Sequence, residues 1–325
     1  FDGQLGKIYN NAQLMGKIDL PTNIPTSFRF IASISTFDYY KKDKLFSRND
    51  KPSFNSKDER FVKLMVALPF LANKRAEFSL GYGQLEDNYF QSSVIDFDKD
   101  RSDRSTYKLL GGSIGFYGST LNTRQYATKG YLEKLIAQVF TGRERFEPGN
   151  PQEGYSPSPQ ERQSWLQISY MKEAYHTMGP KFTLGWMAEA LYSSKNFSEN
   201  YTATMMQAGE FAPTPHSKLM YNEAFRANQY VAAGIKPIYV LNDMFQFRTE
   251  FYGFTPIFPI KKNALNKAYY GKAFSRFEYM GEVSVICHLP FGAISAYVNH
   301  YSSPRREWNV GMTIGWQLFN YRFVE

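Results

Sequence analysis

The chain lacks a long apolar run. No stretch approaches the ~18 consecutive apolar residues of a membrane-spanning helix, and the mean hydropathy is −0.46. A single cysteine, Cys287, excludes an internal disulfide framework. No internal stretch rich in glycine, proline or serine divides the 325 residues, so we expect one domain. The formal charge of +8 comes from scattered Lys and Arg mixed with 30 acids, which argues against a nucleic-acid partner.

What the chain does contain is a repeated alternation of apolar and polar side chains. A period of two predicts a β-strand with one apolar and one polar face. Six apolar side chains show it best: Trp308, Val310, Met312, Ile314, Trp316 and Leu318. The pattern predicts about thirteen strands, near residues 10–20, 27–38, 59–69, 75–86, 105–118, 130–142, 162–175, 180–193, 228–240, 243–254, 278–289, 293–301 and 307–319.

The two faces of these strands differ strongly in chemistry. One face carries aliphatic and aromatic residues such as Phe28, Phe30, Ile34, Val62, Leu64, Phe78, Leu80, Phe245 and Phe247. The other carries polar or charged residues such as Arg29, Ser33, Lys63, Glu77, Gln167, Gln246, Arg248 and Glu250. This division predicts an all-β transmembrane antiparallel β-barrel with a polar lumen, and the aromatic content of 17% suits aromatic girdles at both interfaces. A soluble sandwich or propeller is the alternative.

The lengths of the connections favour the barrel over the sandwich. Short connections at 21–26, 70–74, 176–179, 241–242 and 290–292 alternate with long ones at 39–58, 87–104, 143–161, 194–227 and 255–277. The exceptions are an intermediate connection at 119–129 and a brief one at 302–306. Outer-membrane barrels have short periplasmic turns and long external loops. Because an up-and-down barrel of one bacterial chain needs an even number of strands, we expect further strands before Phe1 and a strand at 10–20 that does not pair with 307–319.

The segment Gly111-Gly112-Ser113-Ile114-Gly115 matches the G-x-S-x-G pattern of a nucleophile elbow, which needs a strand, a sharp turn and a helix. Here it lies in the middle of a predicted strand, so we expect its small residues to make room for something packed in the lumen. His176 and His216 are expected in a turn and a loop, and His288 and His300 in the wall. Their spacing indicates neither a metal site nor a cofactor.

Three segments carry a resemblance to a known family. Residues 119–130, STLNTRQYATKG, resemble the D-N-x-x-x-P-T-K-G segment of the bacterial surface antigen superfamily. Residues 281–294 resemble its G-x-x-x-x-x-T-P-x-G-P-L hairpin, and residues 225–230 its V-R-G-[FY] loop tip. The segments TLNTRQYATKG at 120–130, FRANQY at 225–230 and LFNYRF at 318–323 are most similar to barrels fused behind patatin-like phospholipases of Gram-negative bacteria.

This resemblance implies sixteen strands in the intact protein, with a transport-associated domain and a patatin domain upstream of this chain. It also implies that the 194–227 connection folds into the lumen with a tip formed by Phe225, Arg226, Ala227, Asn228, Gln229 and Tyr230. In the family, the tip arginine meets an acid on the barrel wall, for which Glu250 is the first candidate here and Glu282 the second. Ala227 and Asn228 depart from the family pattern, which has a glycine and an aromatic residue there.

The functional hypothesis is the outer-membrane anchor and translocation domain of a patatin-like phospholipase, with no catalytic residue in this chain. We expect the Gram-negative outer membrane as its location, a periplasmic C-terminus, and outer-membrane lipid, glycolipid and other outer-membrane or periplasmic proteins as partners. One rival is a polypeptide-translocation or barrel-assembly factor without a hydrolase, and the other is a passive porin. The sequence preceding Phe1 would discriminate between them.

Overall fold

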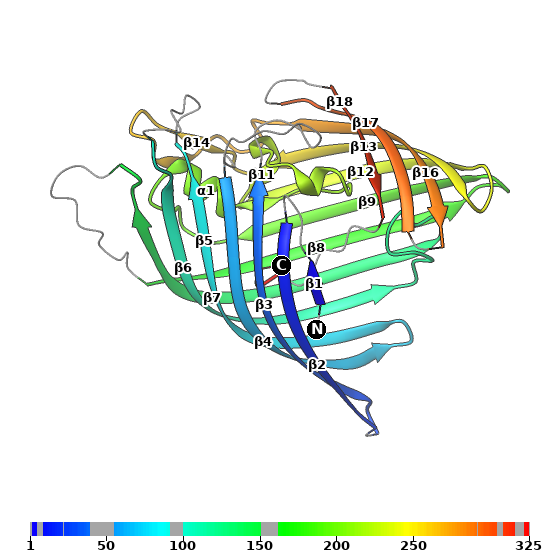
Figure 1. The fold of residues 1–325 in the computed structure, drawn as a ribbon, viewed down its shortest axis with the longest axis horizontal. Coiled ribbons are helices and arrows are strands. Elements are labelled where there is room, and N and C mark those ends of the chain that lie inside the picture. Colours follow the sequence, from blue (N-terminus) through cyan, green and yellow to red (C-terminus); the bar gives the residue numbers. More distant parts are fainter. Residues whose placement is uncertain are drawn as a thin grey trace.

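The computed structural model describes residues 2–4, 9–21, 23–39, 55–91, 100–150, 162–290, 292–303, 308–315 and 322–324. Within these ranges, fourteen strands form one antiparallel sheet in sequence order, and the sheet curves around a hollow (Figure 1). Its strands are β1 (Asp2–Gln4), β2 (Tyr9–Leu20), β3 (Thr26–Tyr39), β4 (Asn55–Leu71), β5 (Lys74–Tyr89), β6 (Asp103–Ser119), β7 (Gly130–Glu147), β8 (Gln163–Thr177), β9 (Phe182–Ser193), β12 (Gln229–Val240), β13 (Phe245–Pro256), β16 (Glu278–Leu289), β17 (Gly292–Tyr301) and β18 (Trp308–Ile314).

The thirteen predicted strands are confirmed, and β1 adds a short fourteenth. β1 pairs with β2, so the first predicted strand is paired on both sides by β1 and β3. In the part of the chain that the structure describes, neither β1 nor β2 pairs with β18, so the sheet stays open there. Several strands are longer than the alternation predicts, since β4 begins four residues earlier, at Asn55, and β7 extends to Glu147.

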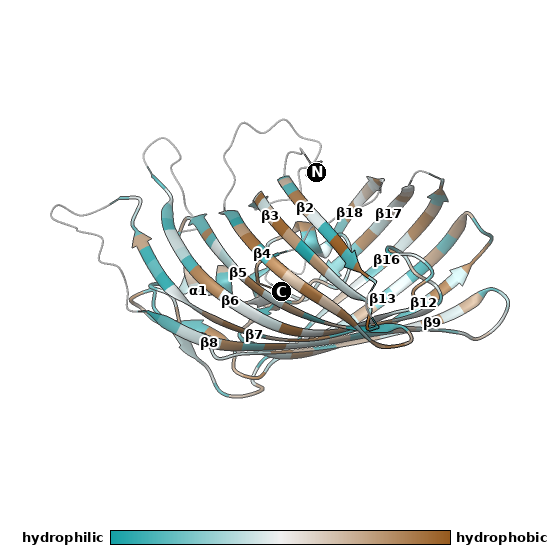
Figure 2. Cartoon of the chain, turned by 90° about the horizontal axis from the view of Figure 1, so that it is seen from below, coloured by the Kyte–Doolittle hydropathy of each residue, from teal (hydrophilic) through white to brown (hydrophobic). Residues whose placement is uncertain are grey.

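The alternating faces lie as the sequence predicts (Figure 2). On β3 and β4, Ile34 and Leu64 are 57% and 60% exposed on the outer face, whereas Ser33 and Lys63 are both 4% exposed on the inner face. The charged residues of the inner face are therefore buried inside the curve, and large apolar residues cover the outside. No helix in the described ranges is long and apolar enough to cross a membrane.

Cross-strand register arranges the outer side chains in rows around the sheet. One charged row runs through Arg60, Gln84, Lys108 and Arg143 on β4–β7, and another through Lys74, Gly118, Glu133 and Lys172 on β5–β8. On β5 these rows are ten residues apart, from Lys74 to Gln84. Between them the exposed large residues are apolar: Val62, Leu64, Phe78, Leu80, Tyr82, Leu110, Ile114, Phe116, Leu135 and Val139.

The distance between the two charged rows matches the thickness of a bilayer. At ~3.4 Å per residue, ten residues extend about 34 Å along the strand. At the usual barrel tilt of ~45° this corresponds to about 24 Å, close to the ~25 Å apolar band of outer-membrane barrels. The outer face of β4–β8 thus has an apolar band of the height a membrane requires.

Four residues of the predicted closing strand continue this exposed apolar face. Trp308, Val310, Met312 and Ile314 on β18 alternate with the less exposed Asn309, Gly311 and Thr313. Trp316 and Leu318 lie outside the described residues.

Candidate functional site

The 194–227 segment, which connects β9 to β12, lies inside the hollow (Figure 1). It contains the helix α1 (Tyr201–Gln207), the two-stranded ladder of β10 (Gly209–Glu210) and β11 (Arg226–Ala227), and two 3₁₀ turns at Ser217–Leu219 and Glu223–Phe225. Asn200 begins α1 because its side chain accepts a hydrogen bond from the backbone N–H of Ala203. The expectation that this segment enters the lumen thus agrees with its position.

α1 is held between the wall and a hairpin of the 255–277 connection. The Asn200 amide donates to the Tyr89 hydroxyl at 2.8 Å, and the Gln207 amide donates to Asp87 at 2.5 Å, both on β5. On its other side, Met205 packs with Ile260 of the β14 (Ile260–Lys262) and β15 (Ala268–Tyr270) hairpin. The hairpin forms within the predicted long connection 255–277, where the alternation gave no signal for it.

Aromatic packing holds the middle of the 194–227 segment. Phe211 and Phe225 are each 1% exposed and pack against Phe254 of β13 and Tyr230 of β12. Burying an aromatic side chain removes ~150–250 Å² of surface from water. The burial of these rings therefore strongly stabilises the position of the 194–227 segment against the wall.

The predicted loop tip is buried against the wall. Arg226, Ala227, Asn228 and Tyr230 are all buried and Gln229 is half-buried. The Asn228 amide donates to the Lys195 carbonyl oxygen and to the Tyr270 hydroxyl, which joins both ends of the 194–227 segment to the β14–β15 hairpin.

Arg226 pairs with Glu210, and the predicted wall partners Glu250 and Glu282 are wrong. The guanidinium Nη2 lies 2.8 Å from the Glu210 carboxylate, and the Tyr221 ring lies 4.7 Å from the guanidinium carbon. The reason is local, because the β10–β11 ladder places Glu210 directly opposite Arg226. A cross-strand neighbour of opposite charge is thus available without reaching the wall.

Each of the two wall acids already has a different partner. Arg248 on the same strand contacts Glu250 at 2.9 Å, and the Tyr252 hydroxyl donates to the second oxygen of Glu250 at 2.8 Å. Glu282 contacts His216 of the 194–227 segment at 2.8 Å. Both acids therefore stabilise the lumen, although neither meets Arg226.

A second buried charge lies where the segment leaves β9. The Lys195 ammonium lies over the rings of Tyr107 and Trp165, 4.5 and 5.0 Å from their centroids, and donates to Gln207. Burial lowers the pKa of Lys195 to about 8, because desolvation disfavours the charged ammonium. The nearby Glu144 carboxylate opposes this shift only in part.

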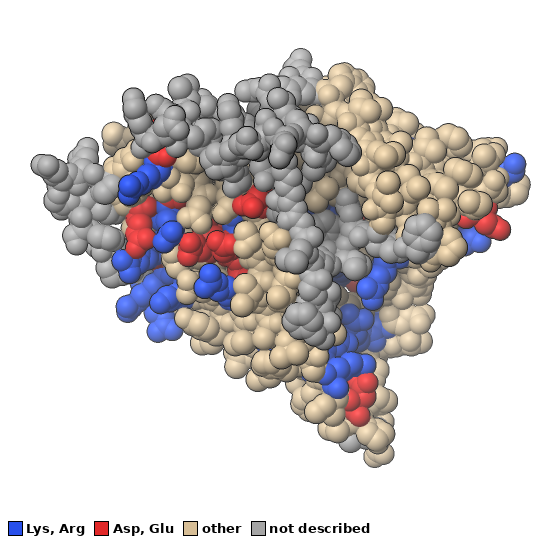
Figure 3. Space-filling model, in the orientation of Figure 1, with Lys and Arg blue, Asp and Glu red and all other residues tan. Residues whose placement is uncertain are grey.

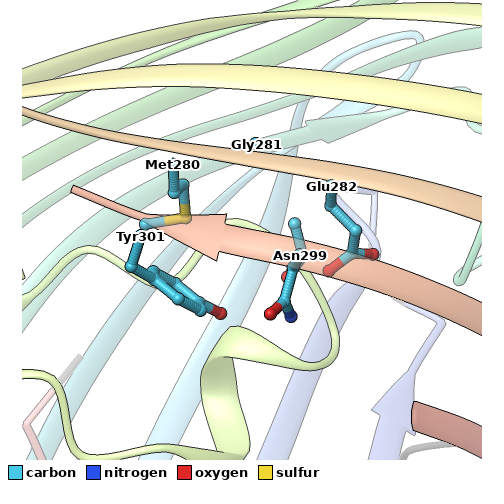
Figure 4. A pocket seen from close by; sticks show the side chains of 6 residues that line it. Met280, Gly281, Glu282, Asn299 and Tyr301 are labelled. Atoms are coloured by element: carbon cyan, nitrogen blue, oxygen red, sulfur yellow. The ribbon is translucent and has the colours of Figure 1, made fainter. Parts of the chain in front are cut away.

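His216 joins the segment to β16 and β17 in an arrangement that resembles a hydrolase triad. Its Nδ1 lies 2.8 Å from Glu282, its Nε2 lies 3.3 Å from the Ser295 hydroxyl, and its ring stacks on Tyr297. Figure 4 shows Glu282 of β16 and Asn299 of β17 projecting to the same side, toward the 194–227 segment. The cleft that they line has no room for a water molecule.

The surroundings of Ser295 do not suit nucleophilic catalysis. Its hydroxyl is 0% exposed and also contacts the hydroxyls of Tyr126 and Thr313. The residue lies in mid-strand with β16 and β18 on its two sides, so its backbone is part of the sheet and offers no oxyanion hole. The arrangement therefore serves to fasten the 194–227 segment to the wall.

Ser113 likewise has the setting that the sequence predicts. It lies within β6 and its hydroxyl contacts that of Ser79 at 2.6 Å on the neighbouring strand. No helix follows it, because β6 leads through residues 120–129 into β7. The setting is thus not that of a nucleophile elbow.

Residues 120–129 cross the lumen at its short-turn end. Gln246 and Arg248 of β13 donate to the carbonyl oxygens of Tyr126 and Ala127, and the Tyr126 hydroxyl donates to Ser295 of β17. The Asn122 side chain caps the turn by accepting from the N–H groups of residues 128 and 129. The TLNTRQYATKG motif thus links β6 and β7 to the opposite wall.

Residues 322–324 also lie inside the hollow. Phe323 is 1% exposed, packs against Phe61 and Phe140, and donates its N–H to Glu59 at 2.6 Å. The glycines of the adjoining wall make room for its ring: Gly81, Gly83 and Gly111. A Cβ on Gly83 would lie 2.9 Å from the ring. The expectation that small residues of the Gly111 region accommodate something in the lumen is thus confirmed.

Comparison with known proteins identifies the fold. No protein-family model and no curated protein sequence matches the chain. BamA from Haemophilus ducreyi lacking POTRA domains 1–3 superposes with a TM-score of 0.62 at 11% identity over 96% of this chain, which spans 63% of that structure. The ferric preacinetobactin receptor BauA of Acinetobacter baumannii gives 0.44 at 11% identity, covering 92% of this chain and 48% of the receptor. The translocator domain of autotransporter NalP from Neisseria meningitidis gives 0.33 at 9% identity, covering 95% and 86%.

The fold is accordingly that of an outer-membrane β-barrel, with the arrangement found in BamA. A soluble sandwich or propeller, the alternative left open by the alternation, is excluded by the single continuous sheet.

Proposed function

We propose that this chain is an outer-membrane barrel domain of the translocation type, and that it anchors and delivers a patatin-like phospholipase. The observation that carries the proposal is that the protein's own segments occupy the lumen. The 194–227 segment, buried Arg226 and residues 120–129 occupy the space that a porin would leave open. A lumen filled by the protein's own segments suits a domain whose role is to hold and pass a polypeptide rather than to conduct small solutes.

In this proposal, the apolar band on the outer face of the sheet lies in the membrane. Charged side chains are costly in hydrocarbon, and two charged rows border an apolar band about as tall as a bilayer core. We place the short turns in the periplasm and the long connections outside, as in outer-membrane barrels. The exposed residues Trp308, Val310, Met312 and Ile314 would then face lipid.

The patatin part rests on the resemblance of residues 119–130, 225–230 and 318–323. Its test uses the full-length protein expressed in a Gram-negative host. We expect it in the outer-membrane fraction with phospholipid hydrolysis that residues 1–325 alone lack. Membrane insertion without hydrolysis would contradict the patatin assignment, and failure to insert would contradict the barrel assignment.

A barrel-assembly or polypeptide-translocation factor without a hydrolase is the second candidate. The likeness to BamA, with a TM-score of 0.62 over 96% of this chain, favours it. Full-length protein in vesicles that accelerates the folding of an added outer-membrane barrel, without hydrolysing lipid, would support this candidate. Large open-channel conductance in a planar bilayer would instead support a porin.

A further inference from the structure

The two charged rows that border the apolar band differ in how their charges are compensated. At the short-turn end, Glu133 lies between two lysines, with Lys74 at 2.7 Å and Lys172 at 3.5 Å. Gly118, which stands between Lys74 and Glu133 in this row, has no side chain to obstruct the contact. The positive charges of this row thus have an acidic partner within the protein.

At the long-loop end, all the charged residues of the row next to the apolar band are basic. It consists of Arg60, Gln84, Lys108 and Arg143, and its three cations are exposed. Among the residues that the structure describes, no carboxylate lies within ion-pairing distance of these three. The acids Asp58, Glu86 and Glu147 lie farther from the band. Asp58 accepts from the Thr36 hydroxyl, and Glu86 and Glu147 are engaged by Arg104 and Arg145.

The spacing of the basic row suits more than one anionic group. With neighbouring strands ~4.8 Å apart, Lys108 and Arg143 on the adjacent strands β6 and β7 can contact one phosphate together. Arg60, on β4, stands about 10 Å from Lys108 across β5. Figure 3 shows basic and acidic side chains gathered on this part of the molecule, over β5 and β6.

We propose that Arg60, Lys108 and Arg143 form a binding site for the phosphate groups of a glycolipid headgroup in the outer leaflet. The proposal rests on the outer-membrane location given under Proposed function. Val62, Tyr82 and Leu110, one step along the same strands, would contact the upper part of the acyl chains. A phosphate accepts charge-assisted hydrogen bonds from guanidinium and ammonium groups, which supplies the missing counter-charge.

The test measures binding of purified diphosphorylated lipid A to the protein in phosphatidylcholine nanodiscs, by native mass spectrometry. The triple variant Arg60→Gln/Lys108→Gln/Arg143→Gln should bind it about tenfold or more weakly, because it removes all three cations that face the headgroup phosphates. The matched control Lys74→Gln/Lys172→Gln, on the same outer face at the other interface, should stay within about twofold of the unmodified protein. All three cations are exposed, so the triple variant should insert normally.

A second ligand separates phosphate recognition from hydrophobic contact. Lipid A stripped of its phosphates should bind the unmodified protein about as weakly as diphosphorylated lipid A binds the triple variant. Equal binding by the triple variant and the unmodified protein, or equally tight binding of dephosphorylated lipid A or phosphatidylglycerol, would overturn the proposal. A protein that fails to enter the nanodisc would instead overturn the proposed membrane location.

Discussion

The two walls of the lumen hold their contents by different chemistry. Along β9–β17, the 194–227 segment is fastened by buried polar and charged contacts, such as His216 with Glu282, together with aromatic packing. Along β3–β8, residues 322–324 are held by the Phe323 ring, which packs in an apolar cup with glycines in its wall, and by hydrogen bonds of their backbone with Glu59 and Lys63. The wall that contacts the 194–227 segment thus carries charged residues such as Glu282, whereas the wall around the Phe323 ring carries glycines.

The largest expected effect is on the polar side. Arg226→Ala should lower the free energy of unfolding by ~3–5 kcal/mol, because it leaves the buried part of the Glu210 carboxylate without its cation. Urea unfolding in detergent, followed by tryptophan fluorescence, measures this loss. The double variant with Glu210→Ala should lose less than the sum of the two single changes.

The same measurement tests the identity of the partner. Combining Arg226→Ala with Glu250→Gln should give additive losses, because Glu250 is paired with Arg248. Strong coupling between Arg226 and Glu250, with none between Arg226 and Glu210, would contradict the assigned pair.

On the apolar side, Phe323→Ala should remove ~3 kcal/mol of docking free energy by emptying the cup. The loss should release residues 322–324 rather than unfold the sheet, because the strands keep their ladders. Trypsin should then cleave after Arg322, which mass spectrometry detects as loss of the following residues. Gly83→Leu, which fills the cup while Phe323 is retained, should give the same cleavage, and protection in both variants would refute the docking.

Lys195, where the 194–227 segment leaves β9, provides a pH test. Its pKa falls from 10.5 in the unfolded chain to about 8 in the folded state, so the unfolded state binds more protons between these values. Stability should therefore rise with pH by ~1 kcal/mol between pH 8 and 9, while below pH 8 the full cost of the buried cation is present. Lys195→Met should remove this rise in unfolding experiments at the two pH values, and an unchanged pH dependence would contradict it.

The smallest effect is expected for the two serines. Neither Ser113→Ala nor Ser295→Ala should change any lipid hydrolysis by the full-length protein, because Ser113 lies in mid-strand and Ser295 is enclosed by other hydroxyls. A fluorophosphonate probe should label neither residue. Labelling of Ser295 would show that the His216 arrangement is catalytic and not only a fastening.

The strands could be predicted from sequence because their signal is local. A period of two identifies both the strand and its buried face, as at Ser33 and Ile34, without knowledge of the partner strand. Strand ends were less well predicted, since the extensions of β4 and β7 lie in polar sequence where the alternation loses its contrast. The β14–β15 hairpin was missed because three-residue strands carry too few residues to show a period.

The contents of the lumen were only partly predictable. The resemblance pointed to Arg226 but not to Glu210, because their pairing depends on a ladder of only two residues a strand, which is too short to show a period in the sequence. His216 was taken as a loop residue, and nothing in its neighbours indicates that it meets Glu282 and Ser295. A site for a bulky side chain could be predicted near Phe323, because Gly81, Gly83 and Gly111 all fall on the inward side of neighbouring strands.

The crossing made by residues 120–129 has a consequence for how the last strands find their register. Tyr126 reaches Ser295, 169 residues further along the chain, and its carbonyl oxygen accepts from Gln246. A slip of one residue in β13 or β17 would turn these partners to the lipid side and leave Tyr126 without them. Residues 120–129 can therefore select the register of the later strands, because only correctly aligned β13 and β17 strands present Gln246 and Ser295 to Tyr126.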